Sequence, residues 1–161
     1  MSAIDPGTRI GHVHLTVSDL DRAVAFYRDA LGFEITARYG PDAVFLAAGG
    51  YHHHVGLNTW AGRGAPAPAR GTTGLYHFAI LYPSRPALAA AVRRVLEHGV
   101  RLDGAADHGV SEAVYLRDPD GNGLELYRDR PEAEWPRGAD GALAMHTRAL
   151  DLEELLAAAG R

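Results

Sequence analysis

The strongest constraint on the fold is an internal duplication. Residues 11–17 (GHVHLTV) are matched by residues 76–82 (YHFAILY), and each segment precedes a stretch with helical periodicity, over 19–31 and 84–98. Three short strand-like runs follow each of these helices. One such unit cannot bury its apolar face alone, so the two copies must pack against each other. The duplication therefore predicts two βαβββ modules.

The segments between and after the copies set the module boundaries. The first module is predicted over about 8–60 and the second over about 75–128. The connector at about 60–74 is rich in Gly, Pro and Ala and reads as extended chain. A C-terminal tail and helix occupy 129–161. We expect an α+β fold in one domain, 1–161, in which both modules form one curved eight-stranded mixed sheet with helices outside.

Composition excludes several classes of protein. The hydrophobic content of 47% and the charged content of 22% are ordinary for a globular domain, which argues against disorder. A net charge of -4 without a basic patch argues against a nucleic-acid binder. No stretch approaches the roughly 18 apolar residues of a membrane span, and no signal peptide is visible. The chain has no cysteine, so disulfides and thiolate ligands are excluded. We expect a cytoplasmic protein with no membrane or nucleic-acid partner.

Strand alternation predicts which polar side chains share the inner face of the sheet. Val13 and Leu15 belong to an apolar row that must pack against the helices, so His12 points to the opposite, inner face of the sheet. The same alternation places His77 and Glu125 on this inner face. Such groups on a largely apolar face are costly unless they are paired or metal-bound. A single strand histidine is more often structural, but the matching repeat positions of the two histidines favour ligands.

Two histidines and one carboxylate are a ligand set suited to non-haem Fe(II) or to Mn(II). The sequence therefore predicts that His12, His77 and Glu125 hold one divalent metal ion. In the strand before the connector, alternation also places His52 and His54 on the inner face and turns His53 toward the helices.

Three segments resemble the vicinal oxygen chelate superfamily, which includes glyoxalase I, fosfomycin resistance proteins and extradiol ring-cleavage dioxygenases. They are residues 11–34 (GHVHLTVSDLDRAVAFYRDALGFE), 74–92 (GLYHFAILYPSRPALAAAV) and 114–127 (VYLRDPDGNGLELY). In these families the metal ligands come from the first strand of each half and the last strand of a half. The resemblance carries these roles over to His12, His77 and Glu125.

Residues 108–125 (HGVSEAVYLRDPDGNGLE) resemble the extradiol dioxygenase signature more closely. The matching positions are His108, Val114, Tyr115, Asp118, Pro119, Gly121 and Glu125, while Ala106 departs from the usual pattern. Residues 48–60 (AGGYHHHVGLNTW) resemble single-domain bacterial proteins of the catechol 2,3-dioxygenase group. The resemblance implies a homodimeric dioxygenase that acts on a small catechol-like aromatic and O2, with Fe(II), Mn(II) or another divalent metal.

The resemblance also implies roles for residues near the metal. His54 is the expected acid–base residue, with His52 as the alternative, and Tyr115 and His108 would hydrogen-bond the substrate oxygens. Two other functions stay open: a glyoxalase-like lyase or isomerase, and a non-enzymatic drug-binding or resistance module. Glyoxalase I normally supplies a second carboxylate from the strand before the connector, a position that falls near Gly56 here, with no acid nearby.

Overall fold

The computed structural model describes residues 3–69 and 71–160. The first half of the chain begins with strand β1 (Val13–Thr16) and helix α1 (Leu20–Ala25), and this helix continues as a π-helical segment, η1 (Phe26–Ala30). Three strands follow: β2 (Glu34–Tyr39), β3 (Ala43–Ala47) and β4 (Val55–Asn58).

The second half repeats the same order of elements. It contains β5 (Phe78–Leu81), α2 (Arg85–Glu97), β6 (Leu102–Asp107), β7 (Ser111–Arg117) and β8 (Gly123–Asp129). The tail adds a 3-10 turn, η2 (Glu132–Glu134), the short strand β9 (Arg148–Ala149) and helix α3 (Leu152–Ala157). The duplicated βαβββ order expected from the sequence is therefore present in both halves.

The strands form two sheets, and this corrects one detail of the expected architecture. The first sheet has the order β1-β4-β3-β2 and the second the order β5-β8-β7-β6-β9. The α+β class is confirmed, but no ladder of the described residues joins the sheets into one of eight strands. Alternation shows which face of a strand is apolar; it does not determine whether two edge strands hydrogen-bond to each other.

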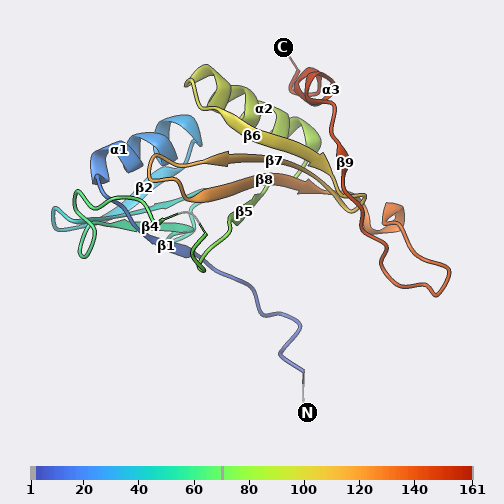
Figure 1. Cartoon of the computed structure of the whole chain (residues 1–161), viewed down its shortest axis with the longest axis horizontal. Coiled ribbons are helices and arrows are strands. Elements are labelled where there is room, and N and C mark those ends of the chain that lie inside the picture. Colours follow the sequence, from blue (N-terminus) through green and yellow to red (C-terminus); the bar gives the residue numbers. More distant parts are fainter. Residues whose placement is uncertain (1–2, 70, 161) are drawn as a thin grey trace.

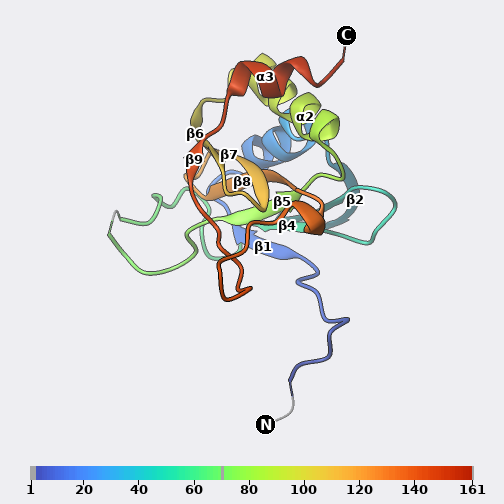
Figure 2. The same ribbon diagram turned by 90° about the vertical axis from the view of Figure 1, so that its right-hand side faces the viewer.

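The helices lie on one side of the sheets (Figures 1 and 2). In Figure 1, α1 lies over the first sheet and α2 over the second, and Figure 2 shows α3 beside α2 on the same side. The core between helices and sheets consists of apolar side chains such as Leu46, Leu57, Leu88, Leu124 and Leu126, each at most 1% exposed. Their strand neighbours must therefore face the opposite, helix-free side.

The helix ends follow from local chemistry. The side chains of Asp19 and Ser84 accept hydrogen bonds from the backbone N–H groups three residues on, at the starts of α1 and α2. The first helical segment ends at Gly32, whose φ of 87° suits glycine. Arg94 of α2 lies against this glycine and donates to the carbonyl of Leu31 at 2.9 Å, so the second half also caps the helix of the first.

Polar contacts from the loop between β7 and β8 tie the two halves together. The Asp120 carboxylate accepts hydrogen bonds from the backbone N–H of Ser18 at 3.0 Å and from Arg22 at 2.7 Å. The buried Tyr27 hydroxyl donates to Asp118 Oδ2 at 3.0 Å. The placement of one sheet relative to the other therefore depends on side-chain contacts in addition to helix packing.

No helix in the described part of the chain is long and apolar enough to cross a membrane.

Candidate functional site

The helix-free face of the second sheet carries a hydrogen-bonded row of four predicted site residues. His77 Nε2 lies 3.0 Å from Glu125 Oε2. The Tyr115 hydroxyl lies 3.3 Å from Glu125 Oε1 and 2.7 Å from His108 Nε2. Tyr115 pairs directly with Glu125 in the antiparallel ladder of β7 and β8, so the sheet register itself brings the two side chains together.

A glycine allows His77 to reach this row. A Cβ atom at Gly123 would lie 2.3 Å from the Tyr76 carbonyl oxygen and 3.1 Å from His77 Cβ. Only a residue without a side chain lets the segment before β5 pass this close to β8. The parallel ladder of β5 and β8 then places His77 one position before the Phe78–Leu124 pair.

The environment of Tyr115 keeps its hydroxyl protonated. Burial, followed by the neighbouring Glu125 carboxylate, raises the pKa of Tyr115 to about 12. At neutral pH this residue is therefore a neutral hydroxyl that can donate one hydrogen bond and accept others.

His12 lies in a different cluster, within the first half. Its ring centroid is 4.4 Å from that of His53, and His53 Nδ1 is 2.8 Å from His52 Nδ1. Burial, followed by the neighbouring histidines, lowers the pKa of His53. The interpretation of His53 as a helix-facing residue was wrong: its ring also lies 5.1 Å from that of Phe45, whose neighbours Val44 and Leu46 are the residues of β3 that face the core. Strand β4 begins only at Val55, so strand alternation does not determine the direction of His53.

His54 is held by the turn that precedes β4. Its Nδ1 accepts a hydrogen bond from the Ala48 N–H at 3.3 Å, and its ring lies 4.7 Å from that of Tyr51 and 6.4 Å from that of Phe33. Among the described residues, no hydrogen bond or ring contact joins His52 or His54 to Glu125.

The predicted metal ligands are therefore only partly assembled. Within residues 3–69 and 71–160, no group of three or more His, Asp or Glu side chains is arranged to hold a metal ion. His77 and Glu125 fit a divalent metal in both donor type and proximity. His12 fits in donor type, but it lies against His53 rather than within this pair.

His14 is a further histidine of the first sheet that was not among the predicted site residues. Its Nε2 lies 2.9 Å from Asn58 Nδ2, and its ring is 5.8 Å from both Phe45 and Trp60. A Cβ atom at Gly56 would lie 2.9 Å from this ring, so the imidazole occupies the space beside the glycine. The signal was available, since His14 belongs to the same alternating row as His12.

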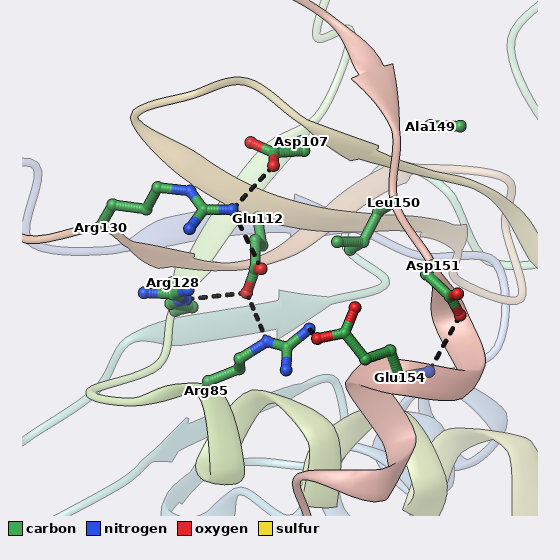
Figure 3. A pocket seen from close by; sticks show the side chains of 9 residues that line it. All are labelled: Arg85, Asp107, Glu112, Arg128, Arg130, Ala149, Leu150, Asp151 and Glu154. Atoms are coloured by element: carbon green, nitrogen blue, oxygen red, sulfur yellow. Dashed lines mark hydrogen bonds and ion pairs between the residues drawn. The ribbon is translucent and has the colours of Figure 1, made fainter. Parts of the chain in front are cut away.

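A second polar cluster lies on the helix side of the second sheet (Figure 3). The buried Glu112 carboxylate accepts hydrogen bonds from Arg85 at 3.0 Å, Arg128 at 2.9 Å and Arg130 at 3.2 Å. Arg85 also pairs with Glu154 of α3 at 3.2 Å. The cluster borders a cavity of about 430 Å³. Because Glu112 and Tyr115 are three residues apart on β7, this cluster and the Tyr115 row lie on opposite faces of the sheet.

Comparison with known proteins identifies relatives along the whole chain. The family model for the Glyoxalase/Bleomycin resistance protein/Dioxygenase superfamily matches residues 9–126. A catechol-2,3-dioxygenase of Bacillus subtilis is 44% identical over 161 residues, which is 99% of this chain and 55% of that protein. A biphenyl-2,3-diol 1,2-dioxygenase of Rhodococcus globerulus is 32% identical over 75% of this chain and 63% of its own length. The chain thus spans less than two thirds of either relative.

A solved structure gives the same result for the fold. The lactoylglutathione lyase of Agrobacterium tumefaciens superposes with a TM-score of 0.58 at 27% sequence identity, over 77% of this chain and 96% of that protein.

Proposed function

Because the chain belongs to the Glyoxalase/Bleomycin resistance protein/Dioxygenase superfamily, we propose that it is an extradiol-type dioxygenase. Its substrates would be O2 and a catechol-like aromatic, whose ring it cleaves. The resemblance expected from the sequence is confirmed at the level of the superfamily. Two of the relatives carry dioxygenase names, one of them aligned along 99% of this chain.

The observation that carries the proposal is the row from His77 to His108. It places an imidazole and a carboxylate in contact, followed by a neutral hydroxyl and a second imidazole. The first two groups suit a metal, and the last two suit the oxygens of a bound catechol. Such an arrangement would supply both a metal-binding pair and groups for proton transfer on one face of the sheet.

A divalent metal, Fe(II) or alternatively Mn(II), would be held by His12, His77 and Glu125. When bound, this ion supplies Lewis acidity and brings both reactants together. Tyr115 and His108 would orient the substrate through hydrogen bonds to its hydroxyl groups. His54 is proposed as the acid–base residue and His52 as its alternative, because an imidazole exchanges a proton near neutral pH.

The test is anaerobic reconstitution of the chain with Fe(II), followed by a catechol and O2. Oxygen uptake together with a yellow ring-cleavage product is expected. Metal binding without oxygen uptake for any of several catechols would refute the proposal. Glu125→Ala should lose bound metal, whereas the matched variant Glu97→Ala, at an exposed position of α2, should retain it.

A lyase or isomerase with the same ligands is the second candidate. It is favoured by the similarity to the lactoylglutathione lyase structure at 27% identity. Turnover of a hemithioacetal substrate without oxygen consumption would identify this activity. The homodimer remains a proposal as well, to be measured by light scattering of the purified chain.

A further inference from the structure

The segment His146–Thr147 lies beyond the matched family region and contacts His108 at three points. The His146 N–H donates to the His108 carbonyl at 3.2 Å. The His146 carbonyl oxygen and the Thr147 hydroxyl each lie 3.2 Å from His108 Nδ1. At Gly109, with φ of 77°, a Cβ atom would lie 2.6 Å from the His146 ring, so glycine is needed for the segment to dock here. The imidazole of His108 is therefore held from its Nδ1 side by the C-terminal tail.

The two groups at Nδ1 differ in what they can do. A carbonyl oxygen only accepts a hydrogen bond, whereas a hydroxyl can also donate one. If the proton of the neutral ring is on Nδ1, the His146 carbonyl accepts it. If the proton is on Nε2, the Thr147 hydroxyl donates to the free lone pair of Nδ1. In both tautomers, the Nδ1 atom of His108 therefore has a hydrogen-bond partner.

The tautomer of His108 determines the direction of the Tyr115 hydroxyl, because that hydroxyl has only one proton to donate. With Nε2 protonated, His108 donates to the Tyr115 oxygen across 2.7 Å, and Tyr115 donates to Glu125. With Nδ1 protonated, Tyr115 donates to Nε2 instead. The Tyr115 oxygen is then free to accept a hydrogen bond from a group bound on the helix-free face.

We propose that Thr147 and the His146 carbonyl are positioning groups that support both tautomers of His108 and thereby set the direction in which the Tyr115 hydroxyl donates its hydrogen bond. The consequence for a bound catechol rests on the proposed dioxygenase function: the tautomer with the proton on Nδ1 leaves the Tyr115 oxygen free to accept a hydrogen bond from a substrate hydroxyl.

The tautomer exchange is tested by ¹⁵N NMR of the histidine rings in the metal-free chain. Among the described residues, Thr147 supplies the only hydroxyl at His108 Nδ1. In Thr147→Val the ratio of Nε2–H to Nδ1–H in His108 should therefore fall about fivefold, the factor produced by loss of one ordinary hydrogen bond. Thr147→Ser and the control Thr73→Val, in the exposed connector, should retain the wild-type ratio. An unchanged ratio in Thr147→Val would overturn the proposal.

The positioning proposal and the dioxygenase proposal can fail separately. Absence of ring cleavage in the Fe(II)-reconstituted wild-type chain would refute the dioxygenase function, while the NMR ratio in the metal-free chain still decides whether Thr147 controls the tautomer of His108.

Discussion

Glu112→Gln should strongly destabilise the protein. The Glu112 side chain is only 4% exposed and accepts hydrogen bonds from Arg85, Arg128 and Arg130, whose side chains are 14–25% exposed. Removing one partner of a buried ion pair costs about 3–5 kcal/mol, and the partial exposure of the arginines places this variant near the lower value. The glutamine amide would also turn an N–H donor toward groups that are themselves donors.

Urea denaturation followed by circular dichroism measures this loss. With an m value of about 2 kcal/mol/M, a loss of about 3 kcal/mol lowers the midpoint by about 1.5 M. The control Glu97→Gln, at an exposed position of α2, should change stability by less than about 0.5 kcal/mol. A loss below about 1 kcal/mol in Glu112→Gln would show that water solvates the three arginines, contrary to the reasoning from burial.

Three further predictions concern contacts of the two halves and the site. Asp120→Asn weakens the bond to the Ser18 N–H and should lower the free energy of unfolding by about 1 kcal/mol, seen as a lower urea midpoint with unchanged slope. Tyr27→Phe removes the buried hydroxyl that donates to Asp118 and should cost about 1–2 kcal/mol in the same assay. The raised pKa of Tyr115, about 12, favours the neutral folded form. Its contribution to stability is therefore complete below about pH 10 and is lost as the pH rises toward 12, and Tyr115→Phe should abolish this loss in pH-dependent denaturation.

The duplicated βαβββ order was predictable because it depends on local signals. Apolar periodicity and the caps Asp19 and Ser84 place the helices, and alternation along β8 puts Glu125 on the face opposite Leu124 and Leu126. Tyr115 was expected near it only from the family resemblance, and the ladder of β7 and β8 pairs the two residues. The residues 52–54 were harder to predict, because an apolar–polar pattern does not show where a ladder begins. Strand β4 begins at Val55, so the orientations of His52 and His53 come from the preceding turn, while the backbone of His54 already bonds to Leu46 and Val13 on the two sides.

Contacts between distant segments could not be predicted. Nothing in the local sequence pairs Asp120 with Ser18, or Thr147 with His108, because such contacts depend on how finished elements dock. The π-helical continuation of α1 at Phe26–Ala30 could not be predicted either, because the spacing of its apolar residues also fits an α-helix. The three predicted metal ligands come from both halves of the chain. Only His77 and Glu125 lie in the same half, and these two are in contact.

The close approach of His14 to Gly56 has a consequence for how this ligand set could evolve. A glyoxalase-like site would carry a carboxylate near position 56, yet the first side-chain carbon there would lie 2.9 Å from the imidazole. Gly56→Glu alone would therefore force the His14 ring to move away from Asn58, whereas replacing His14 by a smaller residue first removes this conflict. The two positions are thus coupled by space: a lineage leading to a second acidic ligand is expected to lose the histidine before it gains the carboxylate.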